Sequence, residues 1–260
     1  HDHGQEALAA LAVRLAQAGA PYPHRYAPAP NTGLRTGLDL DGDGRTGGWA
    51  DAQGFGAFTG QGGMALLSRF PVLADQARDF SGLLWADLPG ARLPTRNGAP
   101  FPSPQAQAVQ RLSTTGHWDV PVLVGGPEGG PEGGQVLHLL AFHATPPVFD
   151  GPEDRNGLRN ADEIRFWQVY LAGALPGHAA PPAPFVLLGV SNLDPADGDG
   201  QRAAMQALLA DPRLQDPAPQ SPGGAAAPAA RNPGHRGDPA RDTAAWPDPG
   251  HLRVSYALPS

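Results

Sequence analysis

The sequence predicts an α/β fold, because a strand, a helix and a second strand follow one another near its centre. The first strand is the apolar run 135–142. The second is the run 185–188, which follows three closely spaced prolines. The helix between them places four large apolar residues on one face, namely Ile164, Trp167, Leu171 and Leu175. This order is that of a βαβ unit, in which the two strands run parallel.

The start of the central helix is predicted from a possible pair of capping residues. Residues 150–160 form a polar stretch, which we interpret as a loop. Asn160 and Glu163 have the spacing of a capping box, in which two side chains bind the first free N–H groups of a helix. The helix is therefore expected to open at Asn160.

The other elements follow from the same kinds of pattern. Helices are expected at 5–18, 103–110 and 201–210, and strands at 64–72, from about Val120 onward, and at 252–258. Residues 125–134 are expected to be the tip of a hairpin. The Pro/Gly/Ala-rich stretch 215–248 is expected to be a long surface loop. We see no repeat and no domain boundary, so we expect one domain over residues 1–260.

Composition limits the kind of function. The net charge is −7 and all 18 basic residues are Arg, so a broad basic surface for nucleic acid is not expected. The chain has no Cys and therefore no thiol chemistry. It has no apolar run of membrane-spanning length. Its start, His1-Asp2-His3-Gly4, is not that of a signal peptide. Oligomeric state cannot be read from the sequence.

Polar side chains follow both strands of the predicted βαβ unit. His143 comes directly after the first strand, and Asn192 and Asp194 follow the second. Since parallel strands end at the same edge of a sheet, these residues are expected to lie close together and to serve a phosphate or a metal. The alternative is an ordinary Asx turn. His117, before another strand, is either a ligand or base, or a plain structural histidine.

Asp39, Asp41 and Asp43 alternate before Gly44, as in the first half of a calcium-binding loop. The match ends at the twelfth position, where a bidentate Glu is expected and Ala50 stands. The stretch is either a structural Ca²⁺ site or a solvated Asp-Gly turn.

The chain resembles the endonuclease/exonuclease/phosphatase superfamily, in a bacterial and often exported branch. The resemblance covers nearly the whole chain and is carried by residues 39–44, 62–71, 113–122, 145–157, 162–167, 237–243 and 252–260. It implies a DNase I-like fold of two packed, mainly antiparallel sheets flanked by helices. It also implies hydrolysis of a phosphate ester or diester with Mg²⁺ or Mn²⁺. An exported location is favoured by the same resemblance.

The resemblance also suggests roles for individual residues. His143 matches the family's histidine after the central strand, and Asn192 matches the Asn of its Gly-Asp-x-Asn motif; both are predicted to be catalytic. Substrate binding is predicted for His117, Arg155 and Asn156, and metal binding for Asp39, Asp41, Asp43 and Asp194.

Two departures leave other functions open. The acid of the Gly-Asp-x-Asn motif is Val190 here, and the Asp expected in the last strand is Ser255. The family's first two strands would precede His1, and its closing Ser-Asp-His segment would follow Ser260, so the fold is expected to be incomplete at both ends. The chain is therefore either a metal-dependent phosphoesterase, a non-catalytic relative that acts as a binding module, or a fragment.

Overall fold

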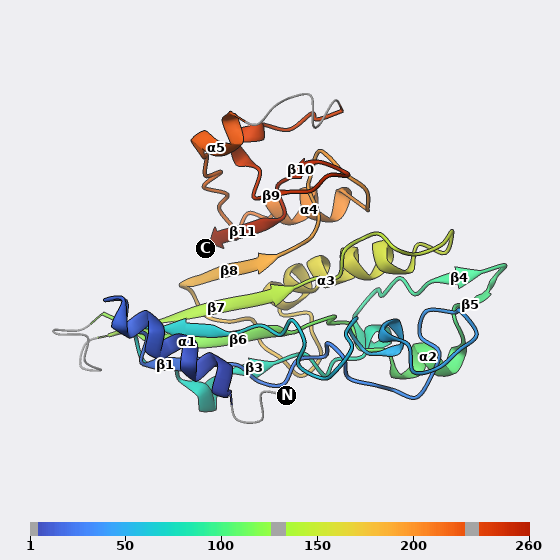
Figure 1. The fold of residues 1–260 in the computed structure, drawn as a ribbon, viewed down its shortest axis with the longest axis horizontal. Helices are drawn as coiled ribbons and strands as arrows, with labels where there is room; N and C mark the ends of the chain where they lie inside the picture. The colour runs from blue at the N-terminus through green and yellow to red at the C-terminus, as the bar shows by residue number, and fades with distance from the viewer. Residues whose placement is uncertain (1–4, 126–133, 227–233) are drawn as a thin grey trace.

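A five-stranded sheet forms the centre of the molecule. The computed structural model describes residues 5–125, 134–226 and 234–260, so most of the predicted tip 125–134 lies outside the described residues. The strand order is β11-β8-β7-β6-β3 (Figure 1). β7 and β8 run parallel, and the other neighbouring pairs are antiparallel. The strands are β3 (Arg78–Asp79), β6 (His117–Val124), β7 (Gln135–His143), β8 (Phe185–Val190) and β11 (Ser255–Pro259).

The predicted βαβ unit is confirmed. β7 leads through helix α3 (Arg155–Leu171) into β8. Ile164 and Trp167 of α3 are completely buried in one core cluster with Leu140 of β7 and Leu187 of β8. Burying a side chain of this size stabilises a fold by about 1.5–3 kcal/mol, so these contacts hold α3 firmly on one face of the sheet. Helix α4 (Ala203–Leu209) packs beside α3.

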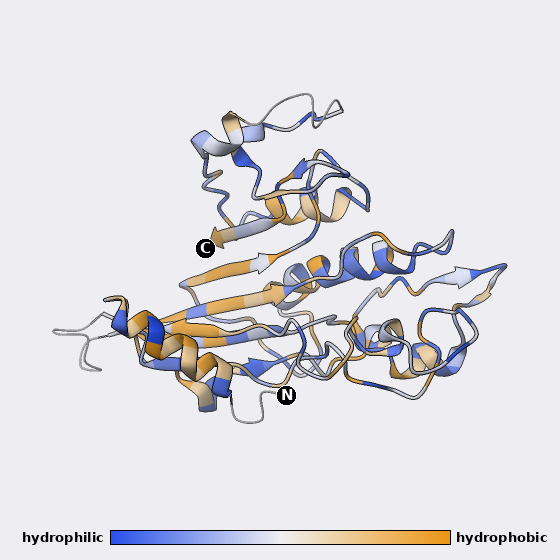
Figure 2. Ribbon diagram, viewed as in Figure 1, coloured by the Kyte–Doolittle hydropathy of each residue, from blue (hydrophilic) through white to orange (hydrophobic). Residues whose placement is uncertain are grey.

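The predicted start of α3 is wrong. The helix begins at Arg155, preceded by Asp154 in the left-handed conformation, so Asn160 and Glu163 lie within it. Both are completely buried. Residues at i and i+3 also share one face of a continuing helix, so the spacing alone does not distinguish a cap from an inner face. The N-terminal half of α3 is coloured as hydrophilic in Figure 2, yet most of it is buried.

A second layer covers part of the opposite face of the sheet. β1 (His24–Tyr26) and β2 (Leu66–Ser68) form an antiparallel pair. The ring of Tyr26 meets Trp118 edge-on, 5.4 Å between ring centroids. Because side chains alternate along a strand, and the neighbouring His117 faces Trp167 of α3, Trp118 points to the other face. The predicted mainly antiparallel α/β fold is confirmed, and in the described residues the second sheet consists of β1 and β2.

The remaining elements lie around the central sheet and, apart from α1, are short. They are α1 (Glu6–Gln17), α2 (Pro104–Val109), α5 (Pro222–Ala225), the 3₁₀ turns Trp49–Asp51, Ala74–Gln76, Trp85–Asp87 and Pro239–Arg241, and the strands β4 (Thr95–Arg96), β5 (Ala99–Pro100), β9 (Ala244–Ala245) and β10 (His251–Leu252). In Figure 1 the C-terminal elements gather at the β11 edge of the sheet. Among the described helices, none combines the length and the apolar character needed to cross a bilayer.

The predicted final strand at 252–258 is divided into two. β10 pairs with β9, whereas β11 pairs with β8. Arg253, between them, donates two hydrogen bonds of 2.7 and 2.6 Å to the carboxylate of Asp216. This paired, nearly buried guanidinium fixes the chain at the point where it passes from one sheet to the other.

Candidate functional site

His143, Val190 and Ser255 lie in one row at the edge of the central sheet, one from each of β7, β8 and β11. Val190 is the register partner of His143 on one side and of Ser255 on the other. The prediction that β7 and β8 end at the same edge is thus confirmed. Paired residues on neighbouring strands direct their side chains to the same face, so this row is one continuous surface.

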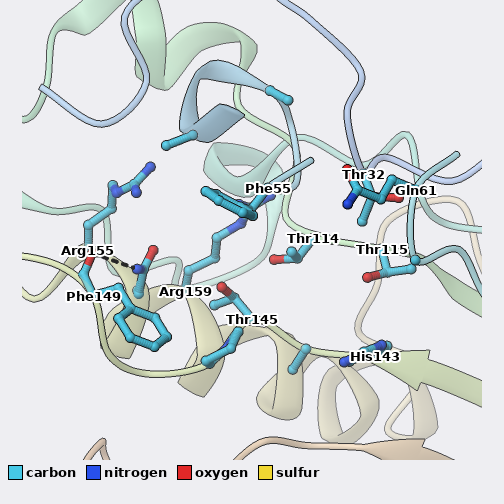
Figure 3. A pocket seen from close by; sticks show the side chains of 16 residues that line it. Thr32, Phe55, Gln61, Thr114, Thr115, His143, Thr145, Phe149, Arg155 and Arg159 are labelled. Carbon is cyan, nitrogen blue, oxygen red and sulfur yellow. Dashed lines mark hydrogen bonds between the residues drawn. The ribbon is translucent and has the colours of Figure 1, made fainter. Parts of the chain in front are cut away.

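A cavity of about 690 Å³ opens beside the end of β7. Figure 3 shows His143 at one end and Arg155 and Phe149 at the other, with Thr114 and Thr145 between them. The lining residues come from segments far apart in the chain: Thr32, Ala50, Ala52, Phe55, Gln61, Gly62, Thr114, Thr115, His143, Ala144, Thr145, Pro146, Phe149, Arg155, Asn156 and Arg159. We call this cavity the His143 pocket.

His143 is the titratable base of the pocket wall. It is half-buried, and its imidazole has no hydrogen-bond partner among the described residues. Burial lowers the pKa of His143, because it removes water from the charged form. At neutral pH the imidazole is therefore uncharged and can accept a proton.

Arg155 and Asn156, predicted to bind substrate, line the other end of the pocket. The Arg155 guanidinium donates one hydrogen bond, 2.6 Å long, to the carbonyl of Leu40. The Asn156 amide donates to the carbonyl of Val148 at 2.7 Å. A guanidinium carries five N–H donors, so Arg155 keeps donors for a ligand. The pocket thus brings together three of the predicted site residues: His143, Arg155 and Asn156.

Three buried polar residues of α3 belong to the surroundings of the pocket: Arg159 lines it, whereas Asn160 and Glu163 bind backbone groups of its wall. Arg159 donates to the carbonyls of Gln53, Arg111 and Leu112, and more weakly to that of Ser113. Asn160 donates to the carbonyls of Thr145 and Ser191. The Glu163 carboxylate accepts from the N–H groups of Thr114 and Thr145. The sequence reasoning assigned none of the three to the site. The sequence does indicate that Asn160 faces inward. It lies four residues before Ile164, and so on the same helix face as the apolar residues Ile164, Trp167 and Leu171.

Asn192 and Asp194 contribute to the loop after β8. Asn192 adopts φ 51°, and its amide donates to the carbonyl of Ala144 at 2.8 Å. It therefore joins the ends of β7 and β8, but it is not among the residues that line the pocket. Asp194 accepts hydrogen bonds from the N–H groups of Ala196, Asp197 and Arg253. Both of its oxygens are engaged, and its metal binding stays a prediction.

His117 is completely buried between the sheet and α3. Its Nε2–H donates to the backbone carbonyl of Glu163, so Nδ1 accepts from the Ser113 hydroxyl at 2.5 Å. Burial lowers the pKa of His117 to about 4. Both ring nitrogens are used and the ring does not line the His143 pocket, which favours the structural role left open by the sequence over the predicted substrate contact.

The Asp39–Asp43 loop brings three carboxylates together. One oxygen from each of Asp39, Asp41 and Asp43 lies within 4.8 Å of the others. Gly44 adopts φ +83°, which permits the turn. Burial, with the charges of Asp43 and Asp51, raises the pKa of Asp41. Asp51 does not complete the set, because its oxygens accept the N–H groups of Leu40 and Gly48. A cation would relieve the crowding of negative charge in this loop.

The loop and the pocket are neighbours. A cleft of about 270 Å³ is lined by Asp41 and Asp43 together with Phe149 and Arg155, which also line the His143 pocket. The bond from Arg155 to Leu40 lies between the two sites. Arg155 therefore contacts the backbone of the loop and lines both cavities.

The comparisons with known proteins identify the family. Residues 5–260 match the model of the endonuclease/exonuclease/phosphatase family. The chain belongs to this family. No curated protein matches it.

Three solved structures are similar to this member of the endonuclease/exonuclease/phosphatase family. One is sphingomyelinase C from Streptomyces griseocarneus, with 16% identity over 96% of this chain and 66% of that one, and a TM-score of 0.45. The second is SmcL, with 13% identity over 75% and 52%, and a TM-score of 0.39. The third is a β-hairpin deletion mutant of beta toxin from Staphylococcus aureus, with 11% identity over 94% and 67%, and a TM-score of 0.41. The chain thus spans between about half and two thirds of the length of these proteins.

Members of the endonuclease/exonuclease/phosphatase family generally use a divalent metal ion. Carboxylate oxygens are the side-chain ligands that would hold such an ion. No carboxylate is among the described residues that line the His143 pocket, and Val190 and Ser255 supply none at the adjoining edge. The pocket wall as described does not fit a Mg²⁺ or Mn²⁺ site, which needs carboxylate oxygens. The Asp39–Asp43 loop does fit a cation that prefers oxygen ligands.

Proposed function

We propose that this chain is a divalent-metal-dependent phosphoesterase that binds and hydrolyses a phosphate ester or diester in the His143 pocket. The observation that carries the proposal is the free, uncharged imidazole of His143 in the wall of a cavity, at the edge where β7 and β8 end. Membership of the endonuclease/exonuclease/phosphatase family supports the reaction class.

The residues of the pocket suggest how a substrate would be held. Arg155 offers its remaining N–H donors to phosphoryl oxygens. The Thr32 hydroxyl is buried in the pocket wall without a hydrogen-bond partner among the described residues, as expected where a polar ligand or water completes the bonding. His143 would accept the proton of the attacking water.

The cation of the proposed function is assigned to Asp39, Asp41 and Asp43, with Ca²⁺, Mg²⁺ and Mn²⁺ as candidates. When bound, a divalent cation supplies positive charge to its surroundings. Its position beside Arg155 supports a role in fixing this end of the pocket through the Leu40 carbonyl.

A second candidate function is favoured by the row at the sheet edge. Val190 and Ser255, paired with one another, stand where the family resemblance places acids. A site without these acids would bind a phosphate ester without turning it over. In that case the chain is a binding module that keeps the fold of the family.

The test is hydrolysis of bis(p-nitrophenyl) phosphate by the purified chain with Mn²⁺, Mg²⁺, Ca²⁺ or EDTA. A phosphoesterase shows metal-dependent turnover that His143→Ala abolishes and that Asn192→Ala, which removes the bond to the Ala144 carbonyl, reduces. The matched control is His178→Ala, since His178 is exposed beyond the far end of α3. Absence of turnover in a chain that melts cooperatively would overturn the enzymatic proposal and leave the binding module.

Export is proposed on the family resemblance alone. Fractionation of cells that express the full-length protein would test it, and retention in the cytoplasm would contradict it.

A further inference from the structure

The two sides of the His143 pocket meet at one buried carboxylate. Thr114 lies in the segment before β6, and Thr145 follows β7. Neither residue belongs to a strand, so strand pairing does not fix its backbone. Both line the pocket. Their N–H groups donate to the two oxygens of Glu163, at 2.6 Å to Oε1 and 2.7 Å to Oε2. Glu163 is completely buried, so water does not compete for these bonds.

We propose that Glu163 is the positioning residue of this pocket: its carboxylate holds the backbones of Thr114 and Thr145 at a fixed separation, and it releases one of them when it is protonated. The inference deepens the proposed function, since the groups positioned are those that would face a phosphate ester.

The chemistry of the carboxyl group explains the release. An ionised carboxylate accepts hydrogen bonds at both oxygens, whereas a protonated one carries an O–H donor on one of them. One of the two backbone N–H groups then faces a hydroxyl instead of a carboxylate oxygen. A buried N–H group that loses its acceptor is unfavourable, so its segment is expected to shift.

The carboxyl group of Glu163 is expected to titrate near neutral pH. Burial raises the pKa of Glu163 to about 7, although the charge of Arg159 and the N–H groups of Thr114 and Thr145 oppose this effect. Among the other titratable or charged groups around it, the two arginines stay cationic and His117 stays uncharged near this pH. Arg159 has a pKa of about 10, His117 one of about 4, and the pKa of His143 is lowered from 6.5; Arg155 stays cationic.

The neighbouring residue on α3 offers a matched control. Asp162 is also completely buried, but its carboxylate accepts from the Trp85 indole and the Arg92 N–H, which lie outside the pocket wall. Asp162→Asn therefore removes a buried charge from the same turn of the helix without changing the acceptors of Thr114 and Thr145.

The test follows the amide ¹H–¹⁵N signals of Thr114 and Thr145 in the whole chain as pH is varied. Both signals are expected to move with one shared midpoint near pH 7. The shift should be absent in Glu163→Gln and kept in Asp162→Asn. Amides that do not titrate in the wild-type chain, or that titrate equally in Glu163→Gln, would overturn the proposal. If Glu163→Gln does not fold, the wild-type chain and His143→Ala decide: amides that do not titrate, or whose titration is lost in His143→Ala, overturn the proposal, and a titration kept in His143→Ala supports it.

A second measurement tests whether the hydrogen bonds of Glu163 to Thr114 and Thr145 affect the binding of a phosphate diester. Dimethyl phosphate keeps a single negative charge over this pH range, so its own titration does not interfere. Its affinity for the wild-type chain is expected to rise through the same midpoint, and Glu163→Gln should bind it about fivefold more weakly at high pH, with no step at that midpoint. A change in affinity at the same pH that persists in Glu163→Gln contradicts the positioning role of Glu163. If the wild-type chain binds no dimethyl phosphate, the proposed function fails, while the amide titration still decides the role of Glu163.

Discussion

Val190 of β8 and Ser255 of β11 are register partners, and His143 of β7 pairs with Val190 on its other side. The two positions where the family resemblance implies acids are therefore direct neighbours at one edge of the sheet. Two separate departures in the sequence become one local feature in the structure. Neither Val190 nor Ser255 supplies a carboxylate that could orient the imidazole of His143 or stabilise its charged form.

Replacing both Val190 and Ser255 with Asp is predicted to increase activity. In Val190→Asp/Ser255→Asp, carboxylates stand beside His143 in the same row, where they can orient the base and bind a cation. We expect Mn²⁺-dependent hydrolysis of bis(p-nitrophenyl) phosphate to rise by at least about tenfold, a small part of what a positioned acid–base pair contributes. The control is Leu188→Asp, on the same face of β8 but paired with Ala141 and Ala257. Equal gains in both variants would argue against a catalytic row.

Calcium is predicted to stabilise the chain through the Asp39–Asp43 loop. A ligand that binds only the folded state at about a hundred times its Kd stabilises by about 2.7 kcal/mol. Asp41→Asn removes one of three carboxylates and should greatly reduce the rise in Tm on adding Ca²⁺. Asp75→Asn, at an exposed position in another segment, should keep the full rise. If calorimetric titration of the wild-type chain with Ca²⁺ gives no heat of binding, the predicted metal site is contradicted.

The pH dependence of stability is predicted to contain two opposing contributions. Glu163 has a pKa of about 7 when folded against 4.5 ordinarily, so the folded state holds the extra proton and the free energy of unfolding falls as pH rises between these values. His117 has a pKa of about 4 when folded against 6.5, so the unfolded state holds the proton and the free energy of unfolding rises from pH 4 to 6.5. If the contribution of Glu163 is removed, the dependence of the free energy of unfolding on pH should show the contribution of His117.

Denaturant unfolding at several pH values between about 4.5 and 6.5 checks this prediction. In Glu163→Gln the free energy of unfolding should rise with pH more steeply than in the wild-type chain. Parallel curves for the two proteins would show that Glu163 does not ionise in this window.

The sequence predicts the centre of the fold well, because β7, β8 and the apolar stripe of α3 are continuous patterns. Strand pairing then determines the position of His143 relative to β8 without further information. The start of α3 is predicted wrongly because most of residues 155–163 are polar or charged, and such residues normally face water. Here Arg159, Asn160 and Glu163 are turned inward to bind backbone groups of several loops. Such partners are brought together only by the folded chain.

The candidate site could be predicted in part for the same reason. His143 and Arg155 are recognised by their chemistry and lie in one pocket. His117 has suitable chemistry too, but its environment decides its role, since Ser113 and the Glu163 carbonyl take both ring nitrogens. Asp194 is similar, because three backbone N–H groups occupy its carboxylate. A residue type indicates what a side chain can bind, and the surrounding backbone determines what it does bind.

The most direct test of the central claim is a titration of the chain with dimethyl phosphate, followed by amide NMR. If the His143 pocket is the site for a phosphate ester, the largest saturable shifts will belong to Thr114, Thr145 and His143, and His143→Ala will weaken binding while His178→Ala will not. This result is expected for both the enzyme and the binding module. Saturable shifts confined to residues outside the pocket, or no saturable shift at any concentration, would contradict the account.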